Sequence, residues 1–196
     1  MAGRKFDPRA ISDPAAIEVL ASPLRQELVD TLFALGGEAS TAALAEALGH
    51  HADGLYYHLR LLCKAGLVED VRAKQFDERL YRLAGRGLAP LRLAYRTGPM
   101  GNAQALLTYV HGLLQIAGKD FEQALASPDV VVSGKRRQLW ASRNKGWLSA
   151  AEVEEVNVLL ERLCALTSQT RSPERDTLMT LVFALSPSVP RAKRRP

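Results

Sequence analysis

The chain has 196 residues and a mass of 21.4 kDa, which suits one large domain or two small ones. Apolar residues make up 47% and charged residues 24%, a composition that excludes a disordered chain, a collagen-like repeat and a disulfide-rich miniprotein. The charged N-terminus has no apolar run behind it, and no stretch approaches the roughly 18 apolar residues of a membrane helix. We therefore expect no signal peptide and no membrane contact.

Cysteine usage and charge add two further constraints. Cys63 and Cys164 lie too far apart for a disulfide framework or a metal-ligand spacing, so we expect a reduced, cytoplasmic protein. Residues 1–85 hold 10 basic and 12 acidic residues, and the remaining residues hold 16 basic and 9 acidic. The basic tail at 187–196 can attract phosphate non-specifically, or it can be a solvated terminus.

Two proline-containing signals near the N-terminus predict the first two helices. Asp13-Pro14 and Ser22-Pro23 each place a capping residue before a proline at the first helical position. We expect residues 1–12, which precede them, to be a flexible N-terminus. The second helix carries leucines at helical spacing and stops at a glycine pair. These leucines are Leu24, Leu28, Leu32 and Leu35.

A short helix, a tight turn and a longer helix follow. The short helix is expected to start at Ser40 or Thr41 and to end at Gly49. The longer helix runs from Ala52 to Ala65, and Gly66 takes the position after its end. Its inward face is marked by leucines at helical spacing. These are Leu55, Leu59 and Leu62.

Two short segments rich in β-tolerant residues complete this part of the chain. Leu67 to Ala73 and Glu78 to Leu83 flank a turn at 74–77 and predict a hairpin. A helix pair followed by a hairpin is winged helix-turn-helix geometry, with the domain expected at 13–85. The second helix of such a pair presents its N-terminal face to the major groove of DNA.

Polar side chains on the longer helix must lie off its leucine face, where they can contact bases or phosphates. Asp53 is expected to cap the helix or to accept from a cytosine amine. Tyr56 and Tyr57 can instead pack on the hairpin or on the second helix, and Arg60 can be a surface ion-pair residue. The DNA-binding candidates on this helix are His51, Asp53, Tyr56, Tyr57, His58 and Arg60.

The run from Leu55 to Val68 resembles the recognition helix and first wing strand of ArsR-like winged-helix transcriptional regulators. Val19 to Arg25 is similar to that family's opening L-x-x-P-x-R pattern, and the resemblance covers roughly residues 13–84. It implies a homodimeric, sequence-specific repressor or activator that contacts DNA through two elements. The contacts would come from His51, Tyr56, Tyr57 and His58 on the recognition helix and from Arg72, Lys74 and Arg79 on the wing.

The sequence departs from the metal-sensing members of that family, which place two cysteines in the helix before the recognition helix. Residues 40–48 contain neither cysteine nor histidine, so we expect no metal and no other cofactor. For His50, His51 and His58 a DNA-facing or solvated position is favoured over a metal cluster. No nucleophile elbow, phosphate-binding loop, dinucleotide fingerprint or zinc-protease motif is present, so the chain is not expected to be an enzyme.

Residues 86–186 are expected to form an α+β region. A short helix is predicted near Gly87 to Tyr95, and a long one begins at Ala103, with an apolar stripe through 114 and an extension toward 125. Short strands are predicted at 129–132, 138–143 and 177–185. A capping box, Ser149 to Glu152, opens a last helix with an apolar face at 153–166.

This second region is interpreted as a dimerisation or sensing unit. Its two apolar helix stripes can pack on each other or across a two-fold axis. Several aromatic residues can line an effector pocket, although plain core packing is the favoured alternative. The pocket candidates are Tyr109, Trp140, Trp147 and Phe183.

Together these features predict a mainly α protein with an α+β C-terminal part. The predicted function is sequence-specific transcriptional regulation, more specifically repression, by a homodimer that binds double-stranded DNA and can respond to a small molecule. Two alternatives stay open. One is a winged-helix protein-interaction module, which the net charge of −2 in residues 1–85 favours. The other is a small-molecule-binding protein with secondary DNA affinity.

Overall fold

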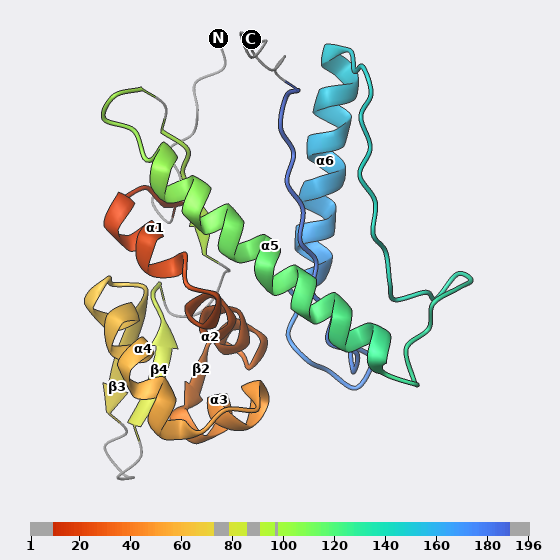
Figure 1. Cartoon of the computed structure of the whole chain (residues 1–196). Coiled ribbons are helices and arrows are strands. Elements are labelled where there is room, and N and C mark those ends of the chain that lie inside the picture. Colours follow the sequence, from red (N-terminus) through yellow and green to blue (C-terminus); the bar gives the residue numbers. More distant parts are fainter. Residues whose placement is uncertain (1–9, 73–78, 86–90, 97, 189–196) are drawn as a thin grey trace, which may run out of the picture.

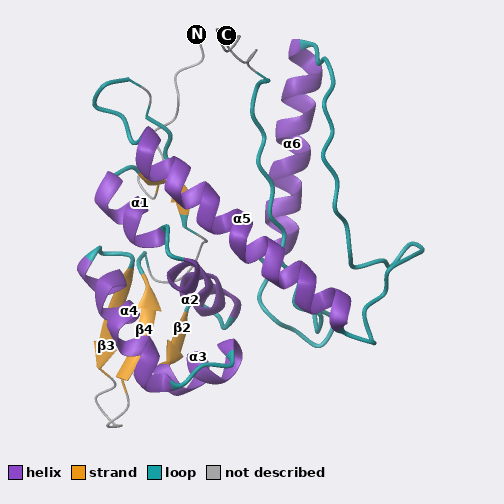
Figure 2. Cartoon of the chain, in the orientation of Figure 1, coloured by secondary structure: helices purple, strands orange, loops and turns teal. Residues whose placement is uncertain are grey.

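A computed structural model describes residues 10–72, 79–85, 91–96 and 98–188 (Figure 1). Six helices and five short strands make up the described part (Figure 2). The helices are α1 (Pro14–Leu20), α2 (Pro23–Ala34), α3 (Thr41–Leu48), α4 (Ala52–Lys64), α5 (Ala103–Ala126) and α6 (Ala150–Thr167). The strands are β1 (Ala10–Ile11), β2 (Glu38–Ser40), β3 (Val68–Arg72), β4 (Arg79–Leu83) and β5 (Arg92–Leu93). In the described residues no helix has the length and apolar character needed to cross a membrane.

Local signals in the sequence account for the ends of the first four helices. The Asp13 carboxylate accepts from the amide of Ala16, and the Ser40 hydroxyl accepts from the amide of Ala43. Ser22 does not act in this way, because its side chain makes no capping hydrogen bond at the start of α2. Gly49 and Gly66 end α3 and α4 with φ angles of 65° and 68°, a left-handed conformation that favours glycine.

The winged helix packs its helices on a three-stranded antiparallel sheet. The strand order is β2-β4-β3, so the predicted hairpin of β3 and β4 gains β2 as a third strand. Tyr81 on the central strand pairs with Ala39 on one side and with Asp70 on the other. The fully buried core between helices and sheet consists of Leu28, Leu32, Leu44, Leu55, Leu59, Leu62 and Leu83.

A second, two-stranded sheet joins the two flanks of the winged helix. β1 pairs in parallel with β5, through Ala10 with Arg92 and Ile11 with Leu93. Two predictions are therefore wrong in the described residues. Residues 10–11, within the segment predicted to be flexible, form a paired strand, and residues 92–93 of the helix predicted near Gly87 to Tyr95 form its partner strand. The pairing partner is distant in sequence, so local patterns gave no sign of it.

The buried side chain of Asn102 holds three segments of this junction together. Its Nδ2 donates to the carbonyl oxygens of Ser12, at 3.2 Å, and of Ala94, at 2.7 Å. Its Oδ1 accepts from the amide of Arg96 at 2.9 Å. Because all of its side-chain hydrogen bonds go to other segments, Asn102 precedes α5 without capping it.

α5 crosses the corner between α1 and α2 at a glycine. A Cβ atom added to Gly112 would lie 2.5 Å from the carbonyl oxygen of Ala21, so only glycine allows this close approach. Nearby, the buried Gln26 donates from Nε2 to the carbonyl oxygen of Tyr109 at 3.4 Å. Ile17 of α1 packs with Ala105 and Leu106 of α5 in a small core of its own.

Beyond this crossing the helices form as predicted but the strands do not. α5 runs to Ala126, and α6 begins at the predicted capping box of Ser149 and Glu152. The strands predicted at 129–132, 138–143 and 177–185 are wrong for this structure, since these residues make no ladder. One backbone hydrogen bond, from Gln138 to Val131 at 2.7 Å, joins the first two. An apolar segment becomes a strand only where an edge is available to pair with it. The predicted fold class is confirmed, because an N-terminal helix-turn-helix domain precedes a region that combines β5 with α5 and α6.

Candidate nucleic-acid interface

The orientation of α4 is fixed by its three core leucines. Leu55, Leu59 and Leu62 have no exposed surface, so the opposite face of the helix points outward. Four residues on that face are exposed, and they lie at helical spacing along it. They are Asp53, Tyr57, Arg60 and Lys64.

Sequence reasoning found the first three of these residues and missed Lys64. The signal was present, because Lys64 follows Asp53, Tyr57 and Arg60 at spacings of four, three and four residues along the chain. Residues at such spacings share one helix face. A lysine in the last turn also interacts favourably with the helix dipole.

Asp53 does not occupy the capping position of α4 that the sequence predicts for it. His51 is the residue that precedes the helix, and its side chain makes no capping hydrogen bond. Asp53 lies inside the first turn, so the prediction that it caps the helix is wrong. Its carboxylate is exposed near the helix N-terminus, where a negative charge is stabilised by the dipole, and it can still accept a hydrogen bond from a base amine.

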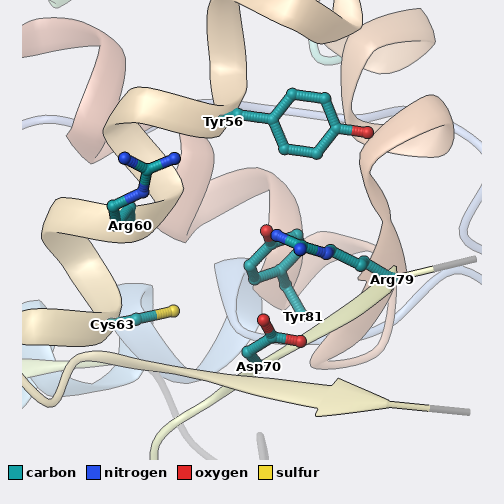
Figure 3. Close-up of a pocket in the computed structure, with 6 residues that line it drawn as sticks. All are labelled: Tyr56, Arg60, Cys63, Asp70, Arg79 and Tyr81. Carbon is teal, nitrogen blue, oxygen red and sulfur yellow. The ribbon is translucent and has the colours of Figure 1, made fainter.

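Tyr56 and Arg60 lie beside the wing and line a small hollow with it (Figure 3). The wing contributes Arg79 and the buried Tyr81, and the Arg79 guanidinium lies beside the Tyr81 hydroxyl. Arg60 and Arg79 thus bring the predicted helix and wing contacts to one place, where two guanidinium groups can bind phosphate oxygens. Asp70, also at the hollow, balances part of their charge.

The thiol of Cys63 lies in the same hollow. Burial raises the pKa of the Cys63 thiol above its ordinary value, and the negative charge of Asp70 adds to this shift. The thiol is therefore protonated at neutral pH, which makes it a weak nucleophile. The hollow offers arginine and tyrosine side chains for binding rather than a reactive sulfur.

His58 is turned away from the outward face, toward α2. Its Nδ1 atom is buried and has no hydrogen-bond partner in the described structure. Burial, followed by the charges of Arg25 and His50, lowers the pKa of His58 below its ordinary value, so the ring is neutral at pH 7. The Tyr57 ring meets it edge to face, with centroids 5.3 Å apart.

The other wing candidates are only partly described. The backbone of Arg72 lies at the end of β3, opposite Arg79, whereas its side chain and the whole of Lys74 are outside the described part. Arg82, the neighbouring arginine on β4, forms an ion pair with Glu38 of β2, with nitrogen and oxygen 2.6 Å apart. Arg82 is thus engaged within the sheet, and Arg79 is the wing arginine that faces the hollow.

The structure does not bring the effector-pocket candidates together. Tyr109 is half-buried near Asp30 and α1, and burial raises its pKa to about 12. Trp140, Trp147 and Phe183 are exposed, with Trp147 fully so. In the described residues no three metal-ligating side chains gather into a group, and the expectation of no metal stays a prediction.

The comparisons with known proteins bear on the N-terminal half alone. The search of curated proteins found no match. A family model described as a helix-turn-helix domain matches residues 20–71, the stretch that contains α2, α3, α4 and most of β3. The outward face of α4 lies within the matched residues. Residues 20–71 are thus a helix-turn-helix domain, which supports a DNA-binding transcription regulator.

Proposed function

We propose that the chain is a sequence-specific transcriptional repressor that binds an operator as a homodimer. The observation that carries the proposal is the outward face of α4, where Tyr57 and Arg60 are exposed on a helix whose other side is locked in the core. A helix held in this way can enter the major groove. The wing, with Arg79 beside Arg60, would contact the adjacent backbone.

Binding to DNA can be tested by fluorescence anisotropy. The purified chain is titrated into a labelled duplex from upstream of its own gene and into a scrambled duplex, over a range of salt concentrations. The expected result is a preference of roughly 10³-fold or more with a steep salt dependence. Equal affinity for a set of genomic duplexes and their scrambled forms would refute sequence-specific regulation.

A pair of substitutions tests the assignment of the helix face. Tyr57→Ala with Arg60→Ala should weaken specific binding by about 10- to 1000-fold and leave the thermal transition nearly unchanged, because both side chains are exposed. The matched control is Tyr95→Ala with Arg92→Ala, which removes the same exposed side chain types outside the helix-turn-helix. Similar losses in both double variants would contradict the assignment.

The homodimer predicts a definite geometry on DNA. Two recognition helices that read a palindrome must lie about 34 Å apart, one turn of duplex. A monomer in sedimentation at micromolar concentration would argue strongly against this arrangement. Control by a small molecule stays a prediction, which ligand-dependent quenching of the exposed Trp140 and Trp147 can test.

A protein-interaction module is the second candidate, because residues 1–85 carry a net charge of −2. Salt dependence separates the two functions, since contacts to phosphates give a steep logarithmic slope. Failure to bind any duplex at low salt would favour the interaction module.

A further inference from the structure

Beyond the middle of α5, the described part of the chain has helices but no buried core. In the described structure no residue after Ile116 is buried. Residues 127–188, which follow the end of α5 (Figure 1) and which we call the C-terminal arm, nevertheless carry many large apolar side chains that are exposed in the single chain. Exposed apolar surface on this scale marks an interaction site. The residues concerned are Trp140, Trp147, Val153, Leu159, Leu163, Leu166, Leu178, Leu181, Phe183 and Leu185 among others.

The accessible surface of the single chain is larger than that of a compact protein of the same mass. The chain exposes 15747 Å², whereas a compact monomer of this mass would expose about 9000 Å². The residues outside the described ranges weigh about 3 kDa and would contribute about 4600 Å² if fully extended. Even so, an excess of about 2000 Å² is left, which is the size that an obligate interface takes from one partner.

The charges of the arm are complementary to each other. α6 carries Glu152, Glu154, Glu155 and Glu161 against a single Arg162. The segment at 135–145 carries five basic residues and no acidic one. None of these residues forms an ion pair in the described structure. A second copy of the same arm, related by a two-fold axis, would place acidic helix against basic segment twice.

Apart from the hydrogen bond between Gln138 and Val131, the segments at 138–143 and 177–185 form no backbone hydrogen bonds in the described structure. Residues 177–185 have strand-forming sequence and follow an extended course (Figure 1), but they belong to no ladder. A segment of this kind presents a row of free amide and carbonyl groups that another chain can pair with.

We propose that the C-terminal arm folds against the arm of a second copy of this chain. In the complex the apolar face of α6 is buried between copies, and the segments at 138–143 and 177–185 pair across the interface as strands. The inference rests on the homodimer of the proposed function and names the part of the chain that forms it. It also places the exposed Trp140 and Trp147 within reach of the partner copy.

A single aspartate on each face of α6 tests the proposal. Leu163→Asp, on the apolar face, should weaken self-association by about 100-fold or more, because it buries a charge between copies. Ala165→Asp, two residues on and exposed on the opposite face, is the matched control and should leave the dimer intact. The thermal transition of the winged helix should not change in either variant, since Leu163 packs on no core residue. Sedimentation of the full chain gives the association state.

Hydrogen exchange identifies the segments that pair. In the wild-type chain the amides at 138–143 and 177–185 should be protected, and Leu163→Asp should abolish that protection. A dimer that persists in Leu163→Asp with both segments exchanging fast would overturn the arm proposal and leave the DNA-binding proposal standing. A wild-type chain that is monomeric at micromolar concentration would overturn the second copy as the occupant. A wild-type chain that forms the dimer with both segments protected, but binds no duplex, would instead refute the proposed function alone.

Discussion

The same glycine-to-alanine change in α5 should have opposite effects at two positions. At Gly118 nothing lies within 4 Å of an added Cβ, so Gly118→Ala should stabilise the fold by about 1 kcal/mol through helix propensity. At Gly112 the added Cβ would lie 2.5 Å from the Ala21 oxygen, about 0.9 Å short of the 3.4 Å of ordinary contact. The carbonyl belongs to the backbone, so α5 itself must shift.

The expected difference follows from that clash. Overpacking of this kind costs about 1–3 kcal/mol, so Gly112→Ala should melt roughly 2–12 °C below Gly118→Ala at about 2–4 °C per kcal/mol for a chain of this size. Thermal and urea unfolding, followed by circular dichroism, measure the two free energies of unfolding. Equal stabilisation by both substitutions would refute the close crossing of α5 over the corner between α1 and α2.

Two further stability predictions follow from the same region. Asn102→Ala removes three hydrogen bonds and should destabilise the fold by about 2–4 kcal/mol, whereas Asn157→Ala, at an exposed site on α6, should change stability by less than about 0.5 kcal/mol; equal effects in urea unfolding would contradict the buried role of Asn102. Burial, then the charges of Asp120 and Glu27, raises the pKa of Asp30 from 3.8 to about 6. The folded state therefore holds this proton more tightly than the unfolded chain, and stability falls as the pH rises from about 4 to about 6. Asp30→Asn should remove that loss and stabilise the chain at pH 7 by about 1 kcal/mol, a value discounted because the residue keeps exposed surface. Asp53→Asn is the control. A gain from Asp30→Asn at pH 3.5 equal to its gain at pH 7 would contradict the reasoning.

The helix-turn-helix was predictable because its signals are local. Proline at the start of α1 and α2, Ser40 before α3, and glycine after α3 and α4 act within a few residues. The spacing of Leu55, Leu59 and Leu62 also determined which residues of α4 face outward. The direction of His58 could not be predicted in the same way, because it depends on Arg25 and the start of α2.

The elements that escaped prediction depend on partners distant in sequence. β2 is three residues long and exists because β4 offers an edge. β1 and β5 are two residues each, and neither has a pattern that indicates a strand. In the sequence Asn102 resembles an ordinary loop residue, because its hydrogen bonds to Ser12 and Ala94 depend on the fold. Conversely, 177–185 has a strand-forming pattern but pairs with no edge among the residues that the structure describes.

The crossing at Gly112 also makes α5 a lever. The helix continues for 14 residues to Ala126, about 21 Å at the rise of an α-helix. A rotation of about 5° around the crossing moves the far end by about 2 Å. The reverse also holds, so a 2 Å displacement imposed at Ala126 tilts the winged helix by the same angle. In a two-fold dimer the two copies of α4 would then change their mutual orientation by twice that angle, which alters the fit of both helices to successive major grooves.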